Sequence, residues 1–144
     1  MRRLIWTFRF VILVSAIALP FSAQAMTVVP IADDDLALSV RAIVEGRVER
    51  LEAVWSPSRL AVVTYVTVRV DRTLTGPIEP GTIVLRQIGG RAGQYATEVS
   101  GSPRFEPGQR VVLFLNTDGD GALHVAHVSL GHYRVEADPA TGRP

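Results

Sequence analysis

The segment "LAVVTYVTVRVDRTL", Leu60–Leu74, decides the fold class of this 144-residue chain. Four valines share one parity of the residue numbers, Val62, Val66, Val68 and Val70, while polar side chains gather on the other. This period of two is typical of a strand with one buried face. Nine of its fifteen residues are Val, Thr or Tyr, side chains that suit a pleated surface. The pattern predicts a long strand.

Downstream, turn signals separate four further expected strands. The stretch "TGPIEPG", Thr75–Gly81, ends the first strand, and Thr82–Ile88 reads as the next one. A Pro-Gly turn then precedes five consecutive apolar residues, Val111–Leu115, which are consistent with a strand buried on both faces. After the turn "TDGDG", two shorter strands are expected at Leu123–Val128 and His132–Glu136.

Upstream, the segment Leu36–Val54 is compatible with helix or with strand. Apolar residues recur at nearly helical spacing at Leu36, Val40, Val44, Val48, Leu51 and Trp55. The acidic run Asp33–Asp35 suits a helix start, but a helix would hold Gly46 in its interior at a cost of about 1 kcal/mol relative to alanine. We therefore expect one or two helical turns over Leu36–Val40, followed by a strand over Ala42–Val54 that bends at the glycine.

These segments together predict an all-β fold. The expected architecture is a small antiparallel barrel or sandwich, OB-like, with five to six strands and at most one short N-terminal helix. A single domain is expected over residues 36–137, between a flexible acidic start at 26–35 and a C-terminal tail at 138–144. Trp55 is expected to cover one end of the core.

The first 25 residues have the features of a cleaved signal peptide. Three arginines precede the apolar run Phe10–Phe21, and Ala23-Gln24-Ala25 matches the small-x-small pattern of a cleavage site. The apolar run is shorter than the ~20 residues that span a bilayer. We expect cleavage after Ala25, a secreted or periplasmic protein, and no stable membrane anchor after cleavage.

Charge and cysteine content limit the partners and sites of the expected mature chain. Removal of the first 25 residues leaves 12 arginines and 14 acidic residues, a net charge of −2, so the domain has no basic surface typical of nucleic-acid binding. Cysteine is absent, which excludes disulfides and thiolate metal sites. We expect no nucleic-acid partner.

Three stretches carry a resemblance to a known group: "AIVEGRVERL" (42–51), "TYVTVRVDRTLTG" (64–76) and "FEPGQRVVLFL" (105–115). The chain resembles small exported bacterial all-β proteins of no established activity, over about Leu36 to Val135. At a greater distance the layout is similar to the netrin-like, OB-type barrel of the tissue inhibitors of metalloproteinases. Those inhibitors bind the protease zinc through an amino-terminal cysteine, and no residue here matches it, so the resemblance does not imply that mechanism.

The glycine-rich stretch "QIGGRAGQYATEV", Gln87–Val99, does not match a phosphate-binding loop. Its glycines match neither the Gly-x-x-x-x-Gly-Lys-Ser/Thr spacing nor the Gly-x-Gly-x-x-Gly spacing of nucleotide-binding loops, and the chain has no lysine. We expect the glycines to let the chain cross the barrel mouth with positive φ. The long connection that continues to Gln109 is also a candidate contact loop, because long loops in compact domains are often functional. Its candidate binding residues are Arg91, Gln94, Tyr95 and Arg104.

The stretch "NTDGDGALHVAH" is the best metal candidate. Asn116, Asp118, Asp120 and Gly121 occupy positions 1, 3, 5 and 6 of a calcium loop, but His127 stands at position 12, where such a loop has a bidentate glutamate. An Asp- and Gly-rich hairpin turn accounts for the same residues. We favour the turn and assign no metal site and no cofactor, with calcium binding as the open alternative.

The three histidines, His124, His127 and His132, define the alternative function. On a helix the first two would share a face and could bind zinc, whereas on a strand they point to opposite faces. The alternative is thus a small metal-dependent hydrolase built on this cluster. No spacing of nucleophile, base or paired carboxylates supports catalysis, so we favour a non-catalytic exported binding or accessory module that presents the glycine-rich loop to a protein or glycan.

Overall fold

The computed structural model describes residues 32–137 and residue 141. The expected signal peptide, the first residues of the expected mature chain and all of the tail except Thr141 lie outside this part. Within the described residues, no helix has the length and apolar character needed to cross a membrane.

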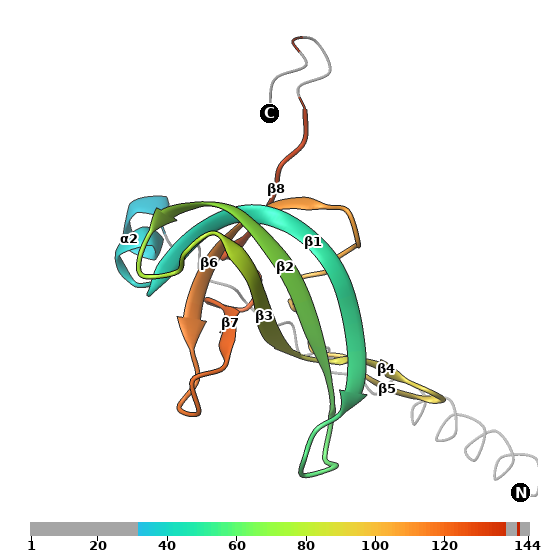
Figure 1. The fold of residues 1–144 in the computed structure, drawn as a ribbon. Coiled ribbons are helices and arrows are strands. Elements are labelled where there is room, and N and C mark those ends of the chain that lie inside the picture. Colours follow the sequence, from blue (N-terminus) through green and yellow to red (C-terminus); the bar gives the residue numbers. More distant parts are fainter. Residues whose placement is uncertain (1–31, 138–140, 142–144) are drawn as a thin grey trace, which may run out of the picture.

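Five strands close into a barrel, in the order β1, β2, β3, β7, β6, with β6 pairing back to β1 (Figure 1). A further strand, β8, pairs with β6 at Val111, Val112 and Leu113. The expected all-β, OB-like barrel with one short helix is therefore confirmed. The strands are β1 (Ala42–Trp55), β2 (Val62–Thr75), β3 (Gly81–Ile88), β6 (Arg110–Thr117), β7 (Leu123–Val125) and β8 (His132–Arg134).

One contact makes the barrel mixed rather than wholly antiparallel. The pairs of β1 with β2, β2 with β3, β1 with β6 and β6 with β7 are antiparallel. β3 and β7 are parallel, and Leu85 with Leu123 is their one register pair in the described chain. A small five-stranded barrel is typical of the OB fold.

The barrel is filled by aliphatic side chains from alternate positions of its strands. The predicted parity of β2 is confirmed, because Val62, Val66, Val68 and Val70 are all buried. The core cluster joins the last three of these to Val44, Val48, Leu85, Phe105, Val111, Leu113, Leu115 and Val125. β6 alternates between buried and half-buried residues, so the expected burial of Val111–Leu115 on both faces is wrong. Its outer side chain Phe114 instead packs against Tyr133 of β8.

A β-bulge changes which side chains of β1 point inward. The register with β2 skips Glu49, which is therefore the extra residue of the bulge. Val44 and Val48 lie in the core before it, and Leu51 packs against the same core after it. The inward parity thus changes from even to odd residue numbers.

The expected bend at Gly46 is found where the register with β2 shifts a second time, between Glu45 and Gly46. A β-carbon at Gly46 would overlap the carbonyl oxygen of Arg69 on the neighbouring strand. Glycine is required here by close backbone approach, as is common at bends in small barrels.

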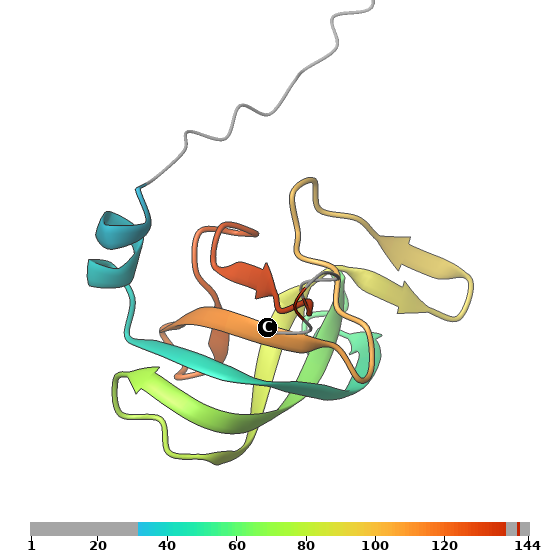
Figure 2. The ribbon, with the colours of Figure 1, turned by 90° about the horizontal axis from the view of Figure 1, so that it is seen from above.

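The glycine-rich stretch forms a β-hairpin rather than the expected loop. β4 (Gly90–Ala92) and β5 (Tyr95–Thr97) pair as a separate two-stranded sheet. The expected positive φ is found at Gly89, Gly90 and Gly93. The hairpin projects from the barrel on the side opposite the N-terminal helix (Figures 1 and 2).

That helix, α2 (Asp33–Leu38), begins three residues earlier than predicted. Asp34 and Asp35 lie in its first turn, where carboxylates complement the helix dipole. Leu36 is buried and Leu38 is exposed, so one face of the helix packs on the barrel.

The last two strands are shorter than predicted. β7 ends at Val125, and His127 and Val128 beyond it adopt left-handed φ values of 49° and 62°, which differ from the extended backbone of a strand. β8 ends at Arg134 rather than Glu136.

Candidate functional site

A groove of about 660 Å³ opens where β3 and β7 separate beyond Leu85 and Leu123. The ends of these strands, Arg86–Ile88 on β3 and His124–Val125 on β7, form two of its walls. The β1–β2 turn and the segment that contains Val99 and Ser102 complete it. The groove is therefore a direct result of the short closing contact of the barrel.

Exposed aliphatic side chains surround this groove. Leu60 on the β1–β2 turn is 87% exposed and Ile88 at the end of β3 is 59% exposed. Val99 and Val128 are also exposed and line the same hollow. Single exposed aliphatic residues are ordinary on protein surfaces, but several around one concavity are typical of an interaction site.

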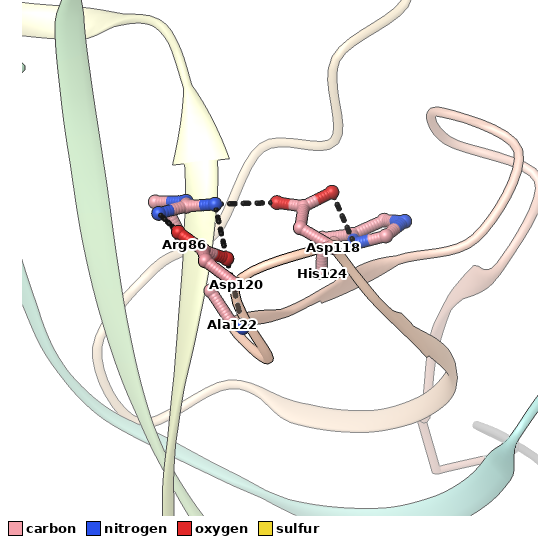
Figure 3. Close-up of polar contacts among 5 residues, drawn as sticks. All are labelled: Arg86, Asp118, Asp120, Ala122 and His124. Carbon is pink, nitrogen blue, oxygen red and sulfur yellow. Dashed lines mark hydrogen bonds and ion pairs between the residues drawn. The ribbon is translucent and has the colours of Figure 1, made fainter.

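A charged cluster forms a polar rim at one end of the groove, which Arg86, Asp118 and His124 line and Asp120 adjoins through Arg86. Figure 3 shows the contacts within this cluster. Arg86 projects from β3 to the β6–β7 turn, where its guanidinium donates to Asp118 at 2.7 Å. The same group donates to both carboxylate oxygens of Asp120, at 2.6 and 2.9 Å. On the other side of Asp118, the His124 Nδ1 atom lies 3.2 Å from a carboxylate oxygen.

These contacts favour the charged forms of Arg86 and Asp120. The hydrogen bonds from Arg86 lower the pKa of Asp120, and the backbone N–H of Ala122 adds to the effect. The hydrogen bonds to Asp120 and Asp118 raise the pKa of Arg86. Two carboxylates face one guanidinium, so the carboxylates of the cluster outnumber its guanidinium groups.

The predicted hairpin turn is confirmed at the calcium-loop candidate. Gly121 donates its N–H to Asp118 O at 2.9 Å, and Asp118 donates to Ala122 O at 2.9 Å. The side chains of Asp118 and Asp120 point to Arg86, which already supplies a cation. Asn116 has a different partner: its Oδ1 atom accepts a hydrogen bond from the backbone N–H of Arg41 at 2.9 Å. The four candidate positions thus do not converge on a common centre.

The three histidines contact three different partners. His124 lies beside Asp118, and His127 Nε2 lies 3.2 Å from Ser39 Oγ. The His132 ring packs edge-on against Phe105, with 4.7 Å between ring centroids, and burial lowers its pKa. Across residues 32–137, no group of three or more His, Asp or Glu side chains is arranged to hold a metal ion.

The contact of Ser39 with His127 does not have the arrangement of a catalytic pair. Ser39 Oγ donates its proton to Leu36 O at 2.8 Å. His127 must therefore donate from Nε2 to the hydroxyl oxygen, whereas a general base would accept that proton. The pair joins α2 to the β7–β8 turn.

The four binding residues expected from sequence do not form one surface. Arg91 and Tyr95 lie on opposite faces of the hairpin, because Arg91 pairs with Ala96 whereas Tyr95 pairs with Ala92. Gln94 is exposed in the turn between the two strands. Arg104 lines a second hollow, of about 520 Å³, that lies between the hairpin base and the barrel interior.

Tyr95 contacts Trp55, the residue that was expected to cover one end of the core. Their ring centroids are 5.3 Å apart in an edge-to-face arrangement. Trp55 is 42% exposed and Tyr95 is 54% exposed, so the expectation for Trp55 is wrong. The pair fixes the hairpin against the end of β1.

Sequence reasoning missed the groove. Leu60, Ile88, Val99 and Val128 are far apart along the chain, and each resembles an ordinary strand or turn residue. The sequence gives no signal for Arg86 either, because only the fold brings it next to the two aspartates.

Comparison of the chain with protein-family models, with curated proteins and with solved structures gave no match.

Proposed function

We propose that this protein is an exported, non-catalytic binding module that holds a protein partner in the groove between β3 and β7. The observation that carries the proposal is the set of exposed aliphatic side chains around that concavity, Leu60, Ile88, Val99 and Val128. Burial of such side chains by a partner is favourable at roughly 25 cal/mol for each Å² of apolar surface removed from water.

A protein partner suits the groove better than a glycan does. Of the described residues that line it, none is Trp, Tyr or Phe, and the exposed aromatic pair Trp55 and Tyr95 is not among them. Sugars commonly stack on aromatic rings, whereas aliphatic walls suit apolar side chains. The glycine-rich hairpin stands beside the groove as a second, polar contact surface, through Arg91 and Gln94.

Affinity capture from the exported fraction of the producing cells tests this function. Wild-type protein and the variants Ile88→Ser and Val84→Ser are immobilised at equal density. Val84 is the matched control, because it lies on the same face of β3 and is 49% exposed but does not line the groove. We expect Ile88→Ser to lose a partner that Val84→Ser retains. Equal recovery by all three proteins would contradict the function.

A further inference from the structure

The two strands that border the groove point backbone N–H and C=O groups toward each other beyond their one register pair. Gly89 donates its N–H to Val62 O at 2.9 Å, on the β2 side of β3. Strand N–H and C=O groups alternate in direction, so those of Ile88 point away from β2 and toward β7. β7 provides no ladder partner there, since its described register with β3 consists of Leu85 and Leu123.

The same reasoning applies to β7. Ala126 donates its N–H to Phe114 O at 2.8 Å, on the β6 side. The backbone groups of Val125 therefore point away from β6 and toward β3. Ile88 and Val125 both line the groove, so a donor and an acceptor stand on each side of it.

Facing backbone groups that share no register pair match the backbone of an extended polypeptide. Addition of a strand to an exposed sheet edge is a recurrent mode of peptide recognition, in which main-chain hydrogen bonds supply affinity and pockets select alternate side chains. Here Ile88, Val99 and Val128 would contact apolar side chains of the segment.

The rim specifies the charge of that segment. Asp118 and Asp120 are both exposed and share a single guanidinium, that of Arg86. The remaining lone pairs of the two carboxylates can accept hydrogen bonds from a second cation. An arginine or lysine side chain is complementary to this end of the groove, and a carboxylate is repelled.

We infer that the occupant is an extended, apolar segment of a partner protein that inserts between β3 and β7, pairs with Ile88 and Val125, and carries a basic side chain at the Asp118–Asp120 end. This inference rests on the proposed function and names the chemistry of its ligand. The inserted segment would complete the barrel at the place where its own strands separate.

Synthetic peptides and isotope-labelled protein test the inference. The first probe is an acetylated, amidated peptide of about six residues, a typical strand length, with alternating valine and threonine and one terminal arginine. The second has glutamate in place of arginine, and the third is the first with N-methylated alternate amides. We expect the first to shift the amide resonances of Ile88 and Val125, and each of the others to bind roughly tenfold or more weakly. The glutamate peptide loses a charge-assisted hydrogen bond to the aspartates, and the N-methylated peptide loses main-chain hydrogen bonds to the strands.

Several results would overturn the inference. Equal affinity of the N-methylated peptide would show that backbone pairing is not used. Shifts confined to Trp55 and Tyr95, or no shifts with any peptide, would place the ligand elsewhere or make it a different chemical class. Concentration-dependent shifts at Ile88 without peptide would identify a second copy of the chain as the occupant. If capture still depended on Ile88 while the peptides failed, the inference would fall and the proposed function would stand.

Discussion

Leu85 on β3 and Leu123 on β7 form the single parallel pair that closes the described barrel. Both strands continue past this pair, but they separate, and the groove lies between their ends. Arg86 and Gln87 lie opposite His124 and Val125 in the register of this pair, yet they form no further register pair with β7.

The hairpin depends on a glycine that cannot be replaced. Gly90 has a φ of 127°, and a β-carbon there would overlap Thr64 Oγ1, which is held by its hydrogen bond to Gly89 O at 2.7 Å. Gly90→Ala is expected to lower the free energy of unfolding by about 2 to 4 kcal/mol, from backbone strain and overpacking together.

The matched control is Gly93→Asn, in the turn of the same hairpin. Gly93 has a φ of 63° and open space around its α-carbon, and asparagine tolerates this conformation. We expect a loss of at most about 1 kcal/mol, since exposed turn substitutions have small effects. Denaturant unfolding of both variants measures the difference, and equal losses would show that the contact with Thr64 is unimportant.

An ion-pair network on β1 predicts a pH dependence. Glu45 accepts hydrogen bonds from Arg72 at 2.6 Å and Arg110 at 2.7 Å, and the bond from Arg72 is the main cause of its lowered pKa. A lowered pKa in the folded state stabilises the protein above the ordinary value of 4.5, and this stabilisation is lost as pH falls through the lowered pKa.

Glu45→Gln is therefore expected to lose about 1 to 2 kcal/mol at pH 7, a charged hydrogen-bond contribution reduced by the exposure of Arg72. The difference from wild type should shrink in acid. Glu52→Gln is the control, because its pair with Arg50 is exposed on both sides. A Glu45 effect that is constant down to low pH would mean that charge is not its origin.

His132 predicts a loss of stability at mildly acidic pH. Burial lowers its pKa from 6.5, and the charge of Arg134 adds to the shift. Between 6.5 and the lowered pKa, the unfolded chain binds a proton that the folded chain does not, so stability falls as the pH falls through this window.

His132→Phe preserves a ring against Phe105 and removes the titrating group. Thermal unfolding at pH 7.5 and pH 5.5 should show a smaller acid destabilisation in this variant than in wild type. His127→Asn is the comparison, because asparagine also accepts the positive φ at that position. Identical acid destabilisation in wild type and His132→Phe would exclude His132 as its source.

The β6–β7 turn predicts the response to calcium. Arg86 already binds Asp118 and Asp120, and the position of a bidentate glutamate is taken by His127. Millimolar calcium is expected to leave the melting temperature of the wild type unchanged. A rise of several degrees that Asp118→Ala abolishes would show that calcium displaces the guanidinium.

The strand pattern was predictable wherever local signals agreed. The parity of the valines in β2, the Pro- and Gly-rich turns and the bend at Gly46 each follow from short-range chemistry, and each is present. The nearly helical spacing of Val44, Val48 and Leu51 does not reflect a helix, because all three lie in strand β1. The bulge at Glu49 inserts one residue, and a strand with such an insertion shows intervals of four and three.

The candidate site was not predictable, because it depends on contacts between distant segments. Arg86 is 32 residues from Asp118, and their contact requires the parallel closure of β3 on β7. β7 is likewise followed by two non-glycine residues with positive φ, for which no local pattern gives a signal. The hairpin at Gly90–Thr97 is too short for periodicity to reveal it.

Photo-crosslinking at single positions tests most directly whether a protein partner occupies the groove beside β3. A photoreactive amino acid replaces Ile88, Val84 or Gln94 in turn, and the protein is irradiated in the exported fraction of the producing cells. We expect a specific adduct with a polypeptide from position 88, absent from position 84, and competed by excess wild-type protein but not by Ile88→Asp. Adducts of equal yield at positions 84 and 88, or an adduct from position 94 without one from position 88, would contradict it.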